Sequence, residues 1–474
     1  MRARVLTNPA VRPNAPPVPK QIRLNAFDMN CIVHQSPGLW THPRDRADTY
    51  NTLDYWTGLA RILERGKFDA LFLADVLGIY DVYCGSPDAA LEGAVQVPVN
   101  DPLMVIPAMA MVTQHLGFGV TCTLSYEHPY PFARRMSTLD HLTNGRIGWN
   151  IVTGYLNSAA KGMGLAQQVG HDTRYEIAED YMDVVYKLWE GSWEDGAVLR
   201  DRASGRFADP AHIHRVEHDG PYFRLSAIHL CEPSTQRTPV LFQAGASTRG
   251  RQFAARHAEC VFINGPSKRV IAPIVADLRR RTAEVGRDPA ELIIFTMMTV
   301  VTDTTPQHAR DKLTEYRRYA SEEGGLVLMS GWTGVDFSKM PMDEVVRFSQ
   351  RDAQTSALEA FTTADPTRSW TVREIAAHTA IGGRSPLVTG SAEQVAQELI
   401  SWVDETDIDG FNLAYAVTPQ TFTDIADLVV PELQARGRFK HDYAPGTFRE
   451  KLYGPGRQRL PASHPAAAFR RSVL

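Results

Sequence analysis

Short, nearly continuous apolar runs recur along the chain and alternate with segments of helical period. The runs lie at residues 22–29, 70–76, 115–124, 146–154, 240–247, 259–265, 292–302 and 410–417. Runs of this kind are typical of strands that are covered on both faces, and their alternation with helices is typical of parallel βα units. We therefore predict an α/β fold in which eight units close into a (β/α)8 TIM barrel.

Three segments between these runs carry clear helix signals. Thr371 and Glu374 are spaced as a capping box, and Ser391 and Gln394 repeat the pattern at the start of a further helix. Within residues 174–190, apolar residues at helical spacing form one stripe that is expected to pack on the barrel: Ile177, Tyr181, Val184, Val185 and Leu188.

One domain with two insertions accounts for the 474 residues. The barrel is expected to span residues 21–436, with insertions near 190–239, after the fourth strand, and near 325–390, after the seventh. Proline recurs in residues 1–20, which are expected to form a flexible arm. Residues 437–474 are aromatic and rich in turns, and we expect an extended tail that wraps its own barrel or that of a neighbour.

Composition narrows the classes of partner. The net charge is −4, from 50 basic and 54 acidic residues, and no basic run is interleaved with aromatic residues, so nucleic acid is not an expected partner. The five cysteines are scattered and never form a C-x-x-C pair, which fits a reducing cytoplasm. The apolar runs are shorter than the roughly 20 residues that span a bilayer, so no membrane segment is predicted. The first twenty residues lack the apolar core of a signal peptide.

Polar residues stand where several predicted strands end: Asp75, Thr121, Asn150, Thr153 and Ser247. Any one of them could simply cap a following helix. In a barrel of parallel strands, however, the carboxyl ends of all strands surround one mouth, where active sites lie. Together these residues therefore predict a ligand site at that mouth.

Residues 243–259, "QAGASTRGRQFAARHAE", give the sharpest local signal. The small residues Ala244, Gly245 and Ala246 allow close backbone approach, and Ser247 and Thr248 place hydroxyls at the start of a predicted helix. The free N–H groups and positive dipole end of such a helix favour a phosphate. The chain has neither the Walker lysine pattern nor G-x-G-x-x-G after a strand, so it does not predict a dinucleotide domain of its own.

Histidines offer a competing interpretation. His212, His214 and His218 in "HIHRVEH" could ligate zinc, but they lie in an insertion without an obvious Asp or Cys partner. His34 and His42, on either side of "QSPGLW" after the first strand, are better placed for the barrel mouth, although a loop hydrogen bond would explain them equally well. A metal-dependent hydrolase on the same barrel remains an alternative, and no metal site is predicted.

Several longer segments resemble a known family. "NAFDMNCIVHQSPGLWTHPRD", "RGKFDALFLADVLGIYDVY", "ARRMSTLDHLTNGRIGWNIVTG" and "HLCEPSTQRTPV" are similar to the two-component flavin monooxygenases of the bacterial luciferase superfamily, in particular to members that oxidise alkanes or nitrilotriacetate. The resemblance covers nearly the whole chain after residue 20. It implies a (β/α)8 barrel that binds FMN, receives it in reduced form from a separate NAD(P)H:FMN reductase, and uses O2 to oxygenate a small organic substrate.

The resemblance also implies how the protein assembles, where its lid lies and which residues act in the site. It implies a homodimer or homotetramer, with a dry pocket under a lid formed by the insertion around residues 325–340. The expected FMN contacts are Ala74, Asp75, Thr121, Asn150, Thr153, Tyr175, Ala246 and Ser247. The expected substrate contacts are Cys31, Tyr80, Gln96 and Leu328. His34 and Tyr155 are the expected catalytic residues, with His34 nearest the reacting oxygen.

Two departures from the family bear on the substrate. The alkane-oxidising members have histidines where this chain has Tyr155 and Leu328, so the pocket is expected to be less basic and more apolar. We therefore expect an uncharged, largely apolar substrate, such as an alkane, an organosulfur compound or an aromatic carrying a heteroatom or halogen. A deazaflavin-dependent oxidoreductase of the same superfamily is the nearest alternative, although its polyglutamyl cofactor favours a strongly basic entrance.

Overall fold

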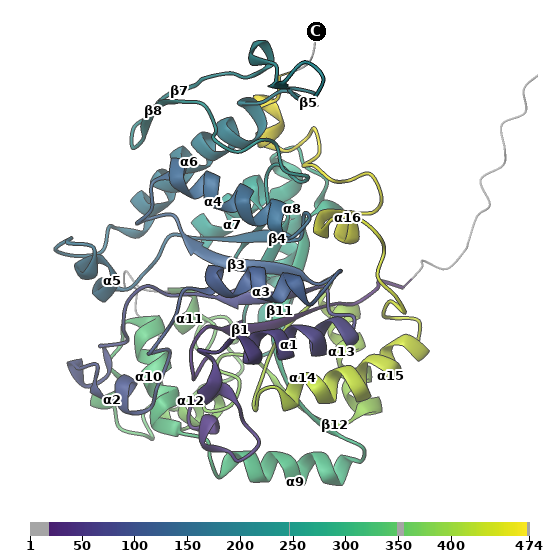
Figure 1. The fold of residues 1–474 in the computed structure, drawn as a ribbon. Coiled ribbons are helices and arrows are strands. Elements are labelled where there is room, and N and C mark those ends of the chain that lie inside the picture. Colours follow the sequence, from purple (N-terminus) through teal and green to yellow (C-terminus); the bar gives the residue numbers. More distant parts are fainter. Residues whose placement is uncertain (1–18, 246, 348–354, 472–474) are drawn as a thin grey trace, which may run out of the picture.

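Eight parallel strands close into a barrel in the computed structural model, which describes residues 19–245, 247–347 and 355–471 (Figure 1). β1 pairs with both β2 and β13, and the pairing of β10 with β11 closes the ring. Each predicted run contains one barrel strand, so the predicted TIM barrel is confirmed. The barrel strands are β1 (Arg23–Met29), β2 (Ala70–Ala74), β3 (Gly117–Thr123), β4 (Ile147–Val152), β9 (Val240–Gln243), β10 (Cys260–Ile263), β11 (Ile293–Asp303) and β13 (Gly410–Ala414).

Alternating residues of these strands fill two separate cores. One set packs against the surrounding helices, while the other points into the barrel, as the two-residue period of a strand requires. The inner core is aromatic, with ring centroids 5.0–6.4 Å apart among Phe27, Phe72, Phe242, Phe262 and Phe295. Burial of each ring contributes about 1.5–3 kcal/mol to folding.

The helices surround the barrel. Of the predicted stripe, Tyr181, Val184 and Val185 are buried on α6 and Ile177 is partly buried, while Leu188 is buried in the π-helix that follows. The capping boxes predicted at Thr371 and Ser391 are confirmed. The α-helices are α1 (Leu53–Arg65), α2 (Asp88–Glu92), α3 (Ile106–Met111), α4 (Pro129–Leu142), α5 (Asn157–Gly162), α6 (His171–Tyr186), α7 (Thr248–His257), α8 (Lys268–Glu284), α9 (Pro306–Arg317), α10 (Glu322–Thr333), α11 (Thr355–Glu359), α12 (Val372–Thr379), α13 (Ala392–Thr406), α14 (Gln420–Asp424), α15 (Val430–Ala435) and α16 (Phe448–Tyr453).

The C-terminal tail plugs the amino-terminal end of the barrel. The ring of Phe448 on α16 stacks on Phe242 with centroids 6.0 Å apart. A Cβ atom at Gly117, where β3 begins, would lie 2.7 Å from that ring, so only glycine leaves room for it. In Figure 1, α16 lies on the side of the barrel opposite α2, α5 and α10. The carboxyl ends of the strands therefore form the open end.

Two excursions leave the barrel. Between β4 and β9, the hairpins β5 (Val198–Asp201)–β6 (Arg206–Ala208) and β7 (Val216–Asp219)–β8 (Arg224–Ala227) project at the top of Figure 1. Between β11 and β13 lie α9 to α13 and β12 (Leu387–Ser391), which pairs with the end of β11. The sequence reasoning missed β12, because "LVTGS" is short and mostly polar or glycine.

The start of the second excursion differs from its prediction. The expected lid around residues 325–340 carries no helix signal in the sequence, but its first part forms α10, in which every residue from Gly324 to Thr333 is buried. A helix that is apolar on all sides shows no amphipathic period, and the two glycines resemble a loop signal. They instead allow close packing, since a Cβ atom at Gly325 would lie 3.0 Å from the Ala376 carbonyl of α12.

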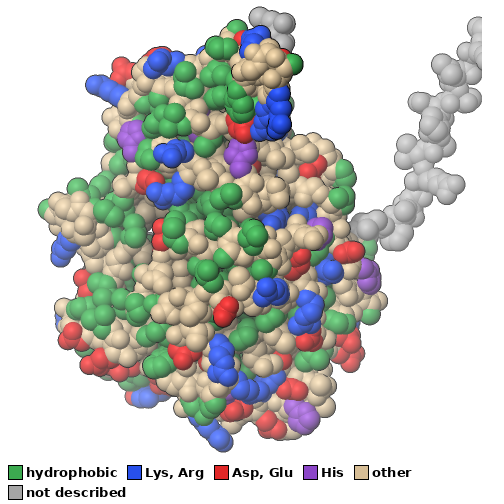
Figure 2. All heavy atoms as spheres, in the orientation of Figure 1, with side chains coloured by type: hydrophobic (Ala, Val, Ile, Leu, Met, Phe, Trp, Pro, Cys, Tyr) green, Lys and Arg blue, Asp and Glu red, His purple; other side chains and the backbone are tan. Residues whose placement is uncertain are grey.

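The described surface carries charge of both signs. On the face shown in Figure 2, acidic and basic side chains are interspersed over the same elements. None of the helices within the described residues is long and apolar enough to cross a membrane.

The plug depends on a buried ion pair. Arg449 is 1% exposed and donates to Glu259 at 2.7 and 3.0 Å and to the carbonyls of Thr238 and Pro239 at 2.9 Å. Arg449→Met leaves Glu259 buried without its charge partner and should lower the free energy of unfolding by about 3–5 kcal/mol. Arg457→Met, which removes an exposed pair with Glu291, should cost less than about 1 kcal/mol. Equal urea midpoints for the two variants would contradict this account.

Candidate active site

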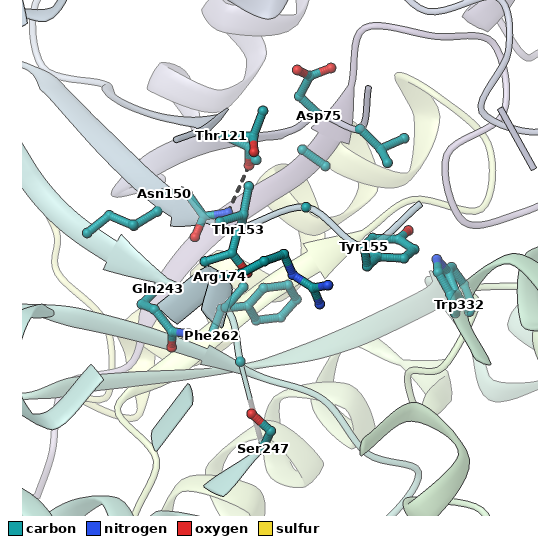
Figure 3. A pocket seen from close by; sticks show the side chains of 18 of the residues that line it. Asp75, Thr121, Asn150, Thr153, Tyr155, Arg174, Gln243, Ser247, Phe262 and Trp332 are labelled. Carbon is teal, nitrogen blue, oxygen red and sulfur yellow. Dashed lines mark hydrogen bonds between the residues drawn. The ribbon is translucent and has the colours of Figure 1, made fainter. Parts of the chain in front are cut away.

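A cavity of about 1130 Å³ opens at the carboxyl ends of the barrel strands (Figure 3). Its wall includes Phe27 and Met29 from β1, Thr121 from β3, Asn150 from β4 and Gln243 from β9. Sites for small molecules and cofactors usually measure about 300–1,000 Å³, so this cavity has room for a cofactor together with a small substrate.

One end of the cavity is built to hold an anion. Ser247 caps α7, and its Oγ accepts from the backbone N–H of Gly250 at 3.0 Å. Arg174, Tyr175 and Arg249 also line the cavity. Burial raises the pKa of the Tyr175 phenol, and Ser247 and both guanidinium groups lie close enough to it for each of them to lower that pKa. A Cβ atom at Gly250 would lie 2.8 Å from the Tyr175 hydroxyl, which shows how closely the side chains approach the first turn. Free N–H groups, a helix dipole and two guanidinium groups together suit a phosphate.

Deeper in the cavity, buried polar atoms lack partners among the described residues. Asn150 donates through Nδ2 to Thr121 Oγ1 at 2.9 Å, but its Oδ1 has no donor. The Oε1 of Gln243 also has no hydrogen-bond donor, and both residues are at most 3% exposed. Leaving such an atom unpaired costs about 1–3 kcal/mol, so the wall is complementary to a ligand that carries hydrogen-bond donors. The N–H groups of a flavin heterocycle meet that requirement.

Asp75 lines the cavity directly after β2. Burial raises the pKa of its carboxyl from 3.8 to about 7, and the nearby Asp101 carboxylate adds to the increase. A carboxyl group in such surroundings changes its charge near neutral pH.

A chain of hydrogen bonds connects the other side of the cavity. The Tyr155 and Tyr80 hydroxyls lie 2.7 Å apart, Tyr80 donates to Gln96 Oε1 at 2.9 Å, and Gln96 Nε2 donates to the His34 carbonyl at 2.8 Å. Because Tyr80 has a single proton, which it gives to Gln96, Tyr155 must donate to Tyr80. The oxygen lone pairs of Tyr155 therefore remain available to the cavity.

His34 lies in the wall and is 1% exposed. Burial lowers the pKa of its imidazole to about 3, an effect that a hydrogen bond with the Phe27 backbone partly offsets. The ring is therefore neutral at physiological pH, and its Nδ1 has no partner among the described residues.

The structure brings most of the predicted site residues to one cavity. Those in its wall are His34, Ala74, Asp75, Tyr80, Gln96, Thr121, Asn150, Thr153, Tyr155, Tyr175 and Ser247. Ala246 lies outside the described residues. Further lining residues that sequence reasoning missed include Gln243, Arg174, Arg249, Trp332 and Arg384. Gln243 is the last residue of β9, one of the predicted strands, so its position at a strand end was the signal that could have revealed it.

Two predicted substrate contacts are corrected. The Cys31 thiol donates to the Val33 carbonyl at 3.2 Å and is not part of the cavity wall. Leu328 on α10 is 0% exposed and packs in an apolar cluster with Tyr80 and Trp332, away from the wall. The sequence carries no signal for α10, and this helix turns Leu328 into the interior.

The histidines of the motif in the insertion hydrogen-bond to carboxylates of the protein itself. His212 and His214 both hydrogen-bond to Glu194, and His218 bonds to Asp180 at 2.8 Å. Across the described residues, His, Cys, Asp and Glu form no group of three or more that could hold a metal ion. The described cysteines are all free.

Known proteins resemble the chain along most of its length. The model of the luciferase-like monooxygenases matches residues 29–407. Dimethyl-sulfide monooxygenase of Hyphomicrobium sulfonivorans is 51% identical over 451 residues, covering 95% of this chain and 94% of that protein. Long-chain alkane monooxygenase of Geobacillus thermodenitrificans (strain NG80-2) is 49% identical over 453 residues, covering 95% and 98%. The solved structure of a riboflavin lyase with modified FMN and riboflavin has a TM-score of 0.89 at 35% identity, covering 96% of this chain and 100% of that one.

The raised pKa of Asp75 predicts a pH-dependent effect on stability. Unfolding lets the carboxyl ionise near 3.8, whereas the folded protein holds the proton to about pH 7, so its contribution to stability falls as the pH rises through that window. Asp75→Asn removes this cost. In protein free of added ligand, the variant should be more stable than wild type by about 1–3 kcal/mol at pH 8 and by less than about 1 kcal/mol at pH 5. Urea unfolding at the two pH values measures the difference in stability between the variant and wild type. A difference that is the same at both pH values would show that burial does not raise the pKa of Asp75.

Proposed function

The chain belongs to the luciferase-like monooxygenase family, and we propose that it uses reduced FMN and O2 to oxygenate a small, largely apolar organic substrate. The observation that carries the proposal is the cavity at the carboxyl ends of the strands, with an anion-binding end at α7 and unpaired acceptors at Asn150 and Gln243. The relatives act on dimethyl sulfide and long-chain alkanes by name, and the riboflavin lyase structure contains modified FMN.

In this proposal each end of the cofactor meets a different part of the wall. The N-terminus of α7, with Ser247, Tyr175 and neighbouring arginines, holds the phosphate. Thr121, Thr153 and Asn150 bind the ribityl chain and the ring, beside Ala74 and Asp75. Reduced flavin, when bound, supplies the electrons that activate O2. The protein positions the ring, holds the substrate and excludes water.

His34 and Tyr155 are the proposed catalytic side chains. Because its imidazole is neutral, His34 can accept a proton at Nδ1 but supplies no positive charge. Tyr155 presents an acceptor oxygen, since its proton goes to Tyr80. In this proposal the substrate lies between a proton acceptor and an oriented phenol. Tyr80 orients the Tyr155 phenol, and Gln96 holds the backbone of His34.

In this proposal, the second excursion, between β11 and β13, excludes water from the cavity. Trp332 of α10 and Tyr80 belong to one apolar cluster, and both line the cavity. The proposed lid around residues 325–340 is thus a packed helix and its following turn. Dry surroundings prevent loss of activated oxygen to solvent.

Two partners follow from the proposal. A separate NAD(P)H:FMN reductase supplies the reduced cofactor, in keeping with the lack of a dinucleotide fingerprint in the sequence. The chain itself assembles as a homodimer or homotetramer, which light scattering of the purified protein tests directly.

Recognition of the phosphate predicts that FMN binds at least tenfold more tightly than riboflavin, because hydrogen bonds to a charged group are about twice as strong as neutral ones. Gly250→Ala places a Cβ atom 2.8 Å from the Tyr175 hydroxyl and should abolish most of this preference. Gly58→Ala is the matched control, since nothing lies within 4 Å of a Cβ atom there. Flavin fluorescence titrations measure both affinities. If the wild type binds FMN and riboflavin equally well, the N-terminus of α7 does not bind the phosphate.

The reaction itself is tested by turnover with FMN, NADH, a flavin reductase and a panel of thioethers, alkanes and halogenated aromatics. Isotopically labelled O2 should appear in the product. His34→Ala should lower the product formed per NADH by about tenfold or more, while hydrogen peroxide release continues. His42→Asn, on the same loop but paired with Glu315, should stay close to wild type. If the His34→Ala variant forms as much product per NADH as wild type, His34 has no part in the mechanism.

A further inference from the structure

A positive charge is held in the cavity wall, away from the anion-binding end at α7. Arg384 lines the cavity, and its guanidinium lies over the ring of Trp332, 4.7 Å from the ring centroid. Figure 3 shows Trp332 beside Tyr155 and apart from Ser247, so this region is distinct from the start of α7. Within the described residues Arg384 forms no ion pair, and its buried Nε has no hydrogen-bond partner.

The backbone around Arg384 is fixed on both sides. Gly382 and Gly383 have φ angles of 82° and 61°, and a Cβ atom on either would overlap the side chain of Thr299 or Gln35. The Gly382 N–H donates to Ser36 Oγ at 3.0 Å, and Ser385 Oγ lies 2.7 Å from Thr299 Oγ1. The guanidinium is therefore presented by a rigid turn, which lowers the entropy that a ligand must overcome.

The polar groups near this arginine do not neutralise it. The ionisable groups that act on its charge are the Tyr155 and Tyr80 phenols. Burial raises the pKa of both, that of Tyr155 to about 12, so the two phenols stay uncharged. Glu359 also lines the cavity, but it is exposed. An unpaired guanidinium in a part-buried wall is costly unless a ligand supplies the countercharge.

We propose that Arg384 is a specificity-determining residue that binds an anionic oxygen group on the substrate, so that the preferred substrate is an apolar chain or ring carrying one carboxylate-like oxyanion. This inference rests on the proposed function and replaces our expectation of an uncharged substrate. The planar guanidinium can donate to both oxygens of a carboxylate. Tyr80 and Trp332 then surround the apolar part, which extends toward His34 and the reacting oxygen.

The test uses a methylthio-alkanoate and its primary amide, which match in size and differ in charge. On the FMN-loaded wild type, calorimetry should show the carboxylate binding at least tenfold more tightly than the amide. Arg384→Met should reduce this ratio to within about twofold, and Arg384→Lys should keep part of it, since it retains the charge. Arg373→Met removes an exposed arginine of α12 and should leave the ratio unchanged.

The ratio separates recognition from general damage, because a merely structural role of Arg384 would weaken both ligands equally. A wild type without preference, or an Arg384→Met variant that keeps the preference, overturns the proposal. Turnover is measured separately with the reductase. Loss of oxygen transfer to both compounds, with the binding ratio intact, would count against the monooxygenase function and leave the anion site standing.

Discussion

The pairing of buried polar atoms is the constraint on which the site depends. Asn150 and Gln243 line the cavity, and their side-chain carbonyl oxygens have no donor among the described residues, in a barrel whose inner core is largely apolar and rich in aromatic rings. An aromatic core would gain more from apolar residues at these positions. Each unpaired amide oxygen therefore costs stability that a ligand with hydrogen-bond donors would recover, and a flat heterocycle provides such donors along one edge.

The closed end of the barrel makes this arrangement possible. Phe448 and the buried pair of Arg449 with Glu259 fill the amino-terminal end of the barrel, and the cavity lies on the side of the strand carboxyl ends. There α7 presents its N-terminus, while α10 and α12 pack across the opposite side of the mouth. The anchor for a phosphate and the apolar cover thus face each other across one cavity, and both are built on rigid elements.

Sequence patterns predicted the barrel well because strands buried on both faces appear as unbroken apolar runs. They also located Asp75, Thr121 and Asn150, since strand ends are fixed once the strands are known. Elements that depend on tertiary contacts were missed. The strand β12 exists only because β11 is long enough to pair with it, and α10 lacks any period because it is buried on all sides. Arg384 follows two glycines within an insertion, and no local pattern shows that its side chain reaches the cavity.

Desolvation reduces the negative charge that the buried part of the cavity wall carries near neutral pH. Burial keeps His34 neutral and holds the pKa of Asp75 near 7, so neither contributes a full charge of its usual sign at neutral pH. Burial also lowers the pKa of Arg384, but a guanidinium starts so high that it remains protonated. The charges that remain in the buried and part-buried wall are therefore those of the arginines, while the carboxylates of Asp172 and Glu359 in the lining are exposed to solvent. A cavity of this kind favours a cofactor with a phosphate at one end and, at the other, a substrate whose only charge is negative.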